Sequence, residues 1–271
     1  MSIHFGDYTW PELQEIIQKD PLVLLPVGMY EEHGRQMPVS CDTDLVWDSC
    51  IRAAERIKRD IPVLVLPAVW TGYHGFSVNK WPGGIRLEQE TLMKVVYDIC
   101  ASLVRMGIKK IVIANGHGQN PAALEMATRK IIDDFRVVPI ICMPFNLFGR
   151  ETLQKIKEMR RSQQGGMGGH ADEWETSMLL YVNPDHIKME CAVDDSTRYR
   201  SSFIPGDMFP EQEIIKGGIY WSTFNLQDSK NGAQGDPRWA TREMGQLCIE
   251  DAANNFEKLL REYYAFNDYA F

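Results

Sequence analysis

The clearest indication of the fold is a short apolar stretch near the N-terminus, Pro21-Leu22-Val23-Leu24-Leu25-Pro26-Val27-Gly28. An apolar run of this length, closed by glycine, is typical of a β-strand that is buried on both faces, as in parallel sheets. Similar runs predict strands at residues 61–69, 109–114 and 137–143, and amphipathic periodicity predicts helices at residues 44–59, 87–106 and from Pro121 onward. This alternation predicts an α/β fold, with a largely parallel sheet covered by helices on both faces.

The 271 residues, 44% of them hydrophobic, are enough for one sizeable core or for two small domains. A final helix is predicted from about residue 239 to residue 264, with Gly245 as its one weak position. Residues 191–238 have little periodicity but many aromatic and turn-forming residues. Because no linker or internal repeat divides the sequence, we expect one domain that spans residues 1–271.

The charge and hydropathy of the chain argue against several classes of protein. Lysine and arginine total 29 against 37 acidic residues, for a net charge of −8, and no basic run could follow a nucleic-acid backbone. The longest apolar stretches contain about eight residues, far fewer than the roughly 20 of a membrane-spanning helix. The N-terminus lacks the basic start and apolar core of a secretory signal. We therefore expect a cytoplasmic protein that binds neither nucleic acid nor membranes.

Six cysteines are spread through the sequence without a C-x-x-C pair or the spacing of a zinc-binding motif. We expect most of them to be small, buried hydrophobic residues. Cys41 directly precedes an acidic residue, Asp42, but a buried hydrophobic role is the better interpretation for this cysteine as well.

Histidines stand beside glycines directly after two of the predicted strands, at the sheet edge where open parallel sheets bind ligands. Glu31 and His33 follow the first strand, and His117 follows the third within Asn115-Gly116-His117-Gly118. Asp42 lies further along the first loop, and His170 comes after a glycine-rich segment. Imidazole and carboxylate ligands suit a divalent metal such as Zn, Mn or Fe(II). The cluster could hold two such ions, which would share a hydroxide and polarise a carbonyl together.

Each of these motifs also has an ordinary structural interpretation when it is taken alone. Glu31 and His33 form only a Glu-x-His pair, which is weak evidence for metal ligands. The segment around His117 is equally consistent with a tight turn whose glycines adopt positive φ angles. Asp42 or Asp44 could cap the N-terminus of the helix that follows. Taken together at the predicted ligand-binding edge, however, the motifs favour a metal site.

The same motifs, in the same order, resemble those of the creatininase family of metal-dependent amidohydrolases. The resemblance covers most of the chain: Leu25-Pro26-Val27-Gly28-x-x-Glu31-x-His33-Gly34 with Asp42, Asn115-Gly116-His117-Gly118-x-Asn120, His170-Ala171-x-x-x-Glu175-Thr176-Ser177, and Gly235-Asp236-Pro237 followed by Ala240-Thr241. It implies a three-layer αβα fold around a largely parallel sheet, which agrees with the pattern of predicted strands and helices.

The resemblance implies a role for each candidate residue that follows the first and third strands. Glu31 and His117 would bind one metal ion and His33 a second ion, while Asp42 would bridge the two. Creatininase itself completes its site with a glutamate two residues after the histidine of the second motif, where this chain has Gln119. The implied cofactors are two divalent ions per chain, of Zn, Mn or Fe(II).

The fifth ligand and the proton shuttle are expected around the third motif. In the more widespread family pattern the glutamate of the Glu-Thr-Ser triplet, here Glu175, is the fifth ligand. Glu173 is the alternative, because a helix beginning at His170 would place both residues on one face. The resemblance makes His170 a proton shuttle, a role that suits an imidazole with a pKa near neutrality; a buried structural histidine is the alternative. Glu32 is expected to face solvent or to support a ligand, and His74 to be an ordinary residue in a loop that could touch substrate.

The implied activity is hydrolysis, in which a hydroxide that bridges the two ions attacks a carbonyl of a small, cyclic, polar substrate. Creatinine is not the expected substrate, because the chain departs from the creatininase pattern at Gly118, Gln119 and Gly166 and in the loop Trp81-Pro82-Gly83-Gly84. Hydrolytic C–C opening of a cyclic diketone derived from inositol, the chemistry of another branch of the family, is one alternative. A non-catalytic metal-binding protein on the same scaffold is another.

The family also implies a small-molecule substrate as the partner and a closed homo-oligomer, often a hexamer. Five aromatic residues could seal an interface between subunits, line the pocket or complete the core: Trp221, Phe224, Tyr263, Tyr264 and Phe266. The sequence leaves their role open.

Overall fold

The computed structural model describes residues 2–75, 79–196, 201–215 and 229–266. Its main sheet has four strands, β1 (Leu22–Val27), β2 (Val63–Val65), β3 (Lys110–Asn115) and β4 (Ile140–Cys142), in the order β2-β1-β3-β4. All three neighbouring pairs are parallel. The predicted parallel sheet is therefore confirmed, and β1 lies inside it with a partner on each side.

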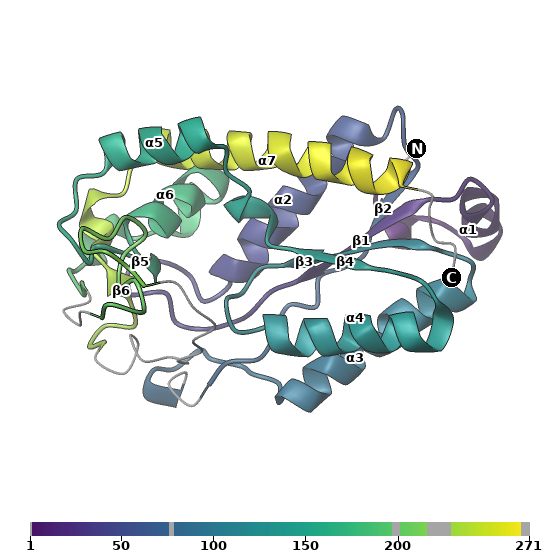
Figure 1. The fold of residues 1–271 in the computed structure, drawn as a ribbon, viewed down its shortest axis with the longest axis horizontal. Helices are drawn as coiled ribbons and strands as arrows, with labels where there is room; N and C mark the ends of the chain where they lie inside the picture. The colour runs from purple at the N-terminus through teal and green to yellow at the C-terminus, as the bar shows by residue number, and fades with distance from the viewer. Residues whose placement is uncertain (1, 76–78, 197–200, 216–228, 267–271) are drawn as a thin grey trace.

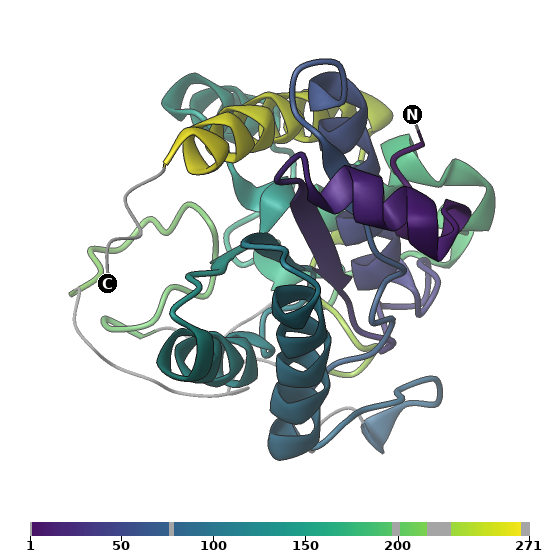
Figure 2. The same ribbon diagram turned by 90° about the vertical axis from the view of Figure 1, so that its right-hand side faces the viewer.

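Helices cover both faces of this sheet, which gives the fold three layers (Figures 1 and 2). One face is covered by α2 (Cys41–Ile57) and α7 (Arg242–Ala265), with α6 (Glu173–Val182) packed against both helices, and the other face by α3 (Gln89–Arg105) and α4 (Pro121–Phe135). α5 (Arg150–Met159) packs on α7, and α1 (Trp10–Ile17) lies near β1 and β2 in Figure 1. The described 3₁₀ helices are Phe5–Asp7, Pro144–Asn146, Pro184–His186, Met189–Cys191 and Pro237–Trp239.

The central strand shows why the predicted strands are apolar throughout. Leu22 and Leu24 of β1 pack into the core beneath α2 and α7. Val23, Leu25 and Val27 pack into the core beneath α3 and α4. Successive side chains of a strand point to opposite faces, so a strand between two helical layers buries every side chain.

The boundary of α2 matters most for the site. The helix is predicted from Asp44 but begins at Cys41, with Ser40 at the N-cap position. Asp42 and Asp44 therefore lie inside the first helical turn, and the interpretation of either residue as the N-cap is wrong. The apolar periodicity could not mark this start, because Asp42 and Thr43 are polar residues that the fold buries.

A second, two-stranded sheet lies beyond one end of the main sheet (Figure 1). It pairs β5 (Met167–His170) with β6 (Gln234–Gly235) in antiparallel orientation. The sequence predicts a strand in neither segment. A Cβ atom on Gly168 would lie 2.3 Å from the carbonyl oxygen of Gln234, so glycine permits this close pairing. The pairing fixes the segment that carries His170.

Two of the aromatic residues considered for an interface have clear positions within the chain. Tyr263 belongs to the core, where it is 7% exposed and its hydroxyl donates a hydrogen bond to the carbonyl oxygen of Val138. Phe266 is exposed at the end of α7. Trp221 and Phe224 lie outside the described residues.

Within the described ranges, no helix combines the length and the apolar character that a membrane span requires. Even α7, with 24 residues, carries acidic and basic side chains along its length.

Gly245 lies where α7 crosses α6, and a Cβ atom there would lie only 1.8 Å from the carbonyl oxygen of Ser177. Gly245→Ala should therefore lower the free energy of unfolding by about 1–3 kcal/mol, because the two helices must move apart. Thermal unfolding followed by circular dichroism measures this loss. Gly6→Ala is the matched control, since no atom lies within 4 Å of the added Cβ. Equal unfolding midpoints for the two variants would contradict the explanation.

Candidate active site

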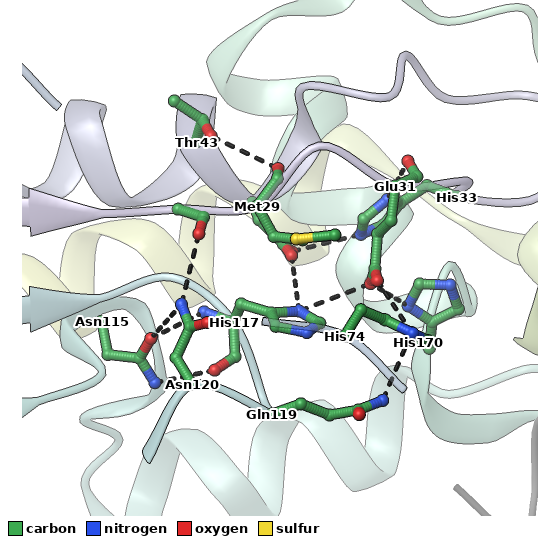
Figure 3. Close-up of polar contacts among 12 residues, drawn as sticks. Met29, Glu31, His33, Thr43, His74, Asn115, His117, Gln119, Asn120 and His170 are labelled. Atoms are coloured by element: carbon green, nitrogen blue, oxygen red, sulfur yellow. Dashed lines mark hydrogen bonds and ion pairs between the residues drawn. The ribbon is translucent and has the colours of Figure 1, made fainter. Parts of the chain in front are cut away.

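Six polar side chains singled out by the sequence come together beyond the carboxyl ends of β1 and β3, and Figure 3 labels four of them, Glu31, His33, His117 and His170. They come from the loops after these strands, the end of β5 and the first turns of α2 and α6. None is more than 8% exposed. They are Glu31, His33, Asp42, His117, His170 and Glu175.

Asp42 lies between two histidines that come from different loops. Its Oδ1 is 3.2 Å from Nε2 of His33, and its Oδ2 is 2.8 Å from Nδ1 of His117. The start of α2 lies so close to the second loop that a Cβ atom on Gly116 would be 2.6 Å from the carbonyl oxygen of Asp42. The chain turns at residues 118–119, but neither Gly116 nor Gly118 has a positive φ angle, so the expectation that these glycines supply positive φ angles is wrong. Gly116 instead permits the close approach that brings Asp42 to His117.

Two asparagine side chains fix the loop that carries His117 (Figure 3). Asn115 accepts a hydrogen bond from the backbone N–H of His117 and donates one to its carbonyl oxygen. Asn120 donates to Oδ1 of Asn115 and to the carbonyl oxygen of Gly28. The loops after β1 and β3 are therefore tied together next to the site.

Glu31 contacts three histidines with its two carboxylate oxygens. Its Oε1 is 3.4 Å from Nδ1 of His117 and 3.5 Å from Nδ1 of His170. Its Oε2 is 2.9 Å from Nε2 of His74. The resemblance to the family pairs Glu31 with His117, and the structure brings these two residues together. His74 is expected to be an ordinary loop residue, and its contact with Glu31 shows that this expectation is wrong.

The two candidate glutamates of the third motif have different partners. Glu175 lies in the cluster, with Oε2 3.7 Å from Nε2 of His33. The carboxylate of Glu173 accepts hydrogen bonds from the backbone N–H groups of Arg161 and Ser162, each at 2.9 Å. Glu173 therefore holds the segment before β5 and is occupied there.

Ala171 makes the turn that lets His170 and Glu175 face the same cluster. Its φ angle is +50°, a left-handed conformation that is strained for a residue with a Cβ atom. The N–H of Ala171 donates to Oε2 of Glu175, and its carbonyl oxygen accepts from Nε2 of Gln36. These two hydrogen bonds hold the strained turn in place.

His170 packs against His33, with ring centroids 4.5 Å apart. Burial lowers the pKa of His170 to about 4, and the positive charge of His33 contributes to the same shift. Within the described residues, Nε2 of His170 has no hydrogen-bond partner, and the ring lines a cavity. A neutral imidazole with a free nitrogen at a cavity is able to accept a proton.

The buried carboxylates strongly favour positive charge in the cluster. Burial raises the pKa of Glu175 to about 8, and the charges of Asp42 and Asp172 add to the shift. Burial alone would lower the pKa of His117, but the carboxylates of Glu31 and Asp42 raise it to about 9. Divalent cations would satisfy the same demand for positive charge.

The donor atoms form overlapping groups of a size that fits metal ions. In one group, the donors of His33, Cys41, Asp42 and Glu175 all lie within 4.8 Å of one another, and a second group contains Glu31, His74 and His117. Nitrogen and carboxylate donors suit Zn and Mn. Burial raises the pKa of the Cys41 thiol, so this member of the first group stays protonated and the other three supply the better donors. The residues present fit divalent metal ions.

A cavity of about 620 Å³ opens over the cluster, a size that suits a small molecule. Its apolar lining comes from the segment after β4 and from the loop at residues 201–215, and includes Met143, Phe145, Ile204, Pro205 and Met208. Asp207 fixes this loop, because its buried carboxylate pairs with Arg160 and accepts a hydrogen bond from the N–H of Gly165. The cavity therefore has an acidic, histidine-rich side and an apolar side.

Other side chains near the site have positions or partners that the sequence does not predict. Glu32 is expected to face solvent or to support a ligand, but it is only 5% exposed; burial and the charge of Glu31 raise its pKa to about 7. Its solvent-facing interpretation is wrong. Gln119 lines the cavity and contacts His74. No local motif joins His74 to Glu31 or Gln119, so the sequence gives no signal for this group.

Comparison with known proteins gives the same family over nearly the whole chain. The sequence profile of the Creatininase family, described as creatinine amidohydrolase, matches residues 6–260. Creatinine amidohydrolase of Pseudomonas putida is 28% identical, over 96% of this chain and 97% of the relative. 3-Dehydro-scyllo-inosose hydrolase of Thermotoga maritima is 27% identical, over 96% of this chain and 83% of the relative.

Solved structures confirm the fold. A crystal structure of creatininase superimposes with a TM-score of 0.79 at 24% identity, covering 98% of this chain and 99% of the other. Two further creatininase structures are described as a Zn-Zn type and as a manganese form. The sequence relatives are hydrolases, which supports a metal-dependent hydrolase. With the profile match over residues 6–260 and the fold in agreement, this chain belongs to the creatininase family.

Proposed function

We propose that this protein is a hydrolase whose one domain holds two divalent metal ions with Glu31, His33, Asp42, His117 and Glu175. The observation that carries the proposal is the position of Asp42, whose two carboxylate oxygens face His33 and His117 separately. Such a carboxylate is suited to bridge two ions, one on the side of Glu31 and the other on the side of Glu175. Glu173 is set aside as a ligand, because backbone N–H groups already occupy its carboxylate.

In the proposed hydrolysis, the metal ions and the side chains of the protein have different roles. Two divalent ions would supply a nucleophile from water at neutral pH and polarise a substrate carbonyl. His170 accepts the proton that the reaction releases and returns it to the leaving group, because its neutral ring presents an unpartnered Nε2 beside the cavity. Met143, Phe145 and Ile204 exclude water from the opposite side.

The proposed substrate is a small, cyclic, polar carbonyl compound of the cyclic-amide type. A 620 Å³ cavity with one apolar side and one acidic side suits a ring that carries polar groups on one edge. Creatinine is not favoured, because Gln119 and Gly118 replace residues of the creatininase pattern.

Hydrolytic C–C opening of an inositol-derived cyclic diketone is the second candidate. It is favoured by the nearly equal similarity of the chain to the Pseudomonas and Thermotoga relatives, at 28% and 27% identity. Turnover measured against creatinine, other cyclic amides and cyclic diketones distinguishes the candidates. Metal binding without turnover on any of these compounds would favour the non-catalytic alternative.

The native ions are proposed to be zinc or manganese, the metals named for the solved creatininases, and the protein is proposed to be cytoplasmic. We also propose a closed homo-oligomer, with a hexamer as the specific expectation. Of the aromatic residues considered for the interface, two remain as candidates among the described residues: Phe266, which is exposed, and Tyr264, which is half-buried. Sedimentation equilibrium measures the assembly.

Asp42→Ala should lose both metal ions, because the variant removes the oxygen that faces each histidine. Elemental mass spectrometry of protein purified without chelator should give about two ions per chain for the wild type. Asp44→Ala, in the same helical turn, is the matched control and should keep both ions. Wild-type protein that takes up no Zn or Mn would refute the proposed site, and full occupancy in Asp42→Ala would refute the bridging role.

His170→Ala should retain the ions and lose catalysis. We expect kcat/KM to fall by about 10²–10⁴-fold, the usual contribution of a general acid–base group. His186→Ala removes an exposed histidine and serves as the control. Unchanged turnover in His170→Ala would show that another group moves the proton.

In metal-free protein, Glu175→Gln should raise stability at neutral and alkaline pH. The folded-state pKa of Glu175 is about 8, above its ordinary value of 4.5, so ionising this group destabilises the folded state as pH rises through that window. The variant avoids this cost, and a gain of about 1 kcal/mol would raise the unfolding midpoint by about 2–4 °C. The difference from wild type should vanish near pH 4.

Glu173→Gln is the matched control for this experiment, since it changes a buried carboxylate in the same helical turn. It should lower the unfolding midpoint, because Glu173 satisfies two backbone N–H groups. Thermal unfolding in excess chelator measures both variants. A lower midpoint for Glu175→Gln at pH 8 would contradict the assigned pKa.

A further inference from the structure

His74 is buried beside the proposed ion site but is absent from the proposed ligand set. It is 1% exposed, and its ring lies 5.5 Å from that of His117, with 29° between the ring planes. Both rings direct a nitrogen atom at Glu31: Nε2 of His74 lies 2.9 Å from Oε2, and Nδ1 of His117 lies 3.4 Å from Oε1 (Figure 3).

The backbone fixes the proton on one nitrogen of His74. Nδ1 is 2.9 Å from the carbonyl oxygen of Gly75. A carbonyl oxygen can only accept a hydrogen bond, so Nδ1 carries a proton and donates it. In the neutral ring, Nε2 therefore presents a lone pair.

Gln119 favours the same state of the ring. Its Oε1 accepts a hydrogen bond from the N–H of Gly75 at 2.9 Å, which leaves the amide nitrogen on the other side. That nitrogen lies 3.3 Å from Nε2 of His74. Because an amide nitrogen donates, it pairs with a lone pair on Nε2 and opposes a proton there.

The lone pair of His74 thus lies 2.9 Å from a carboxylate oxygen of Glu31. Two acceptors at this distance repel each other unless a cation lies between them, either a proton, which the amide nitrogen of Gln119 opposes, or a metal ion. Ligand atoms about 2.0–2.1 Å from a zinc ion at a right angle are separated by about 2.9 Å. A hydrogen bond from Nδ1 to a backbone carbonyl is also the usual outer contact of a metal-binding histidine. His117 supplies a further donor within 4.8 Å of both atoms.

We propose that Nε2 of His74 is a further ligand of the metal ion bound by Glu31 and His117, and that Gln119 is a positioning residue for His74. This inference rests on the proposed function, because it needs an ion at that site. Gln119, at the position where creatininase has a glutamate, contributes to the site by orienting a histidine. The ion would then have donors from Glu31, Asp42, His74 and His117.

Metal stoichiometry under chelator competition tests this ligand. Wild-type protein and the His74→Ala variant are loaded with Zn²⁺, equilibrated against a competing chelator and analysed by elemental mass spectrometry. We expect the wild type to retain two ions and His74→Ala to retain one, with affinity for the lost ion reduced by about 100-fold or more. Gln119→Ala should weaken the same ion by about 10-fold. His186→Ala, which removes an exposed histidine, should match the wild type.

NMR spectroscopy of the cadmium-loaded wild type tests the same ligand directly and does not depend on whether a variant folds. In protein loaded with ¹¹³Cd²⁺, correlations between one cadmium signal and the ring protons of His74 are expected. Their absence, or wild-type affinity for both ions in His74→Ala, would overturn the proposal. A raised KM with both ions retained would instead make His74 a substrate contact, which also overturns it. Wild-type protein that binds no ion would refute the proposed function itself. This result differs from one in which the wild type binds two ions without His74, which would refute only the role of His74.

Discussion

The carboxylate of Asp42, held between His33 and His117, is the interaction on which the arrangement of the site depends. A buried carboxylate between two loops is costly unless each oxygen is paired, so the loops after β1 and β3 and the start of α2 must all adopt their positions together. Gly116 permits this arrangement because a larger residue would collide with the backbone of Asp42. Burying acidic groups at this position lowers the free energy of unfolding, and the same groups provide a binding site for cations.

The sheet and its immediate neighbours were predictable from the sequence, because burial on both faces leaves a clear apolar signal. The stretch at residues 21–28 corresponds to β1 at Leu22–Val27, and the strand predicted at 109–114 corresponds to β3 at Lys110–Asn115. Other strands are shorter than predicted. The strand predicted at residues 61–69 is only Val63–Val65 in the structure, because the residues after Val65 form a loop.

The candidate site was predictable only where its residues belong to local motifs. Glu31, His33, His117 and Glu175 stand in recognisable patterns and meet in the structure, although their roles as ligands stay a prediction. His74 has no such pattern, because its partners Glu31 and Gln119 lie in other loops. β5 and β6 were missed for a similar reason: glycine-rich strands of two to four residues carry no hydrophobic alternation and form only when tertiary contacts bring them together.

The position of α7 has a consequence for biosynthesis. α7 packs on both α2 and α6, the helices whose first turns carry Asp42 and Glu175, and it contacts α6 through Gly245 with no room for another atom. The ribosome completes α7 after every other described element, so these two helices lack their packing partner while its residues remain in the exit tunnel. The nascent chain would therefore expose its acidic and imidazole groups unassembled, and loading of metal would follow the emergence of α7 from the ribosome.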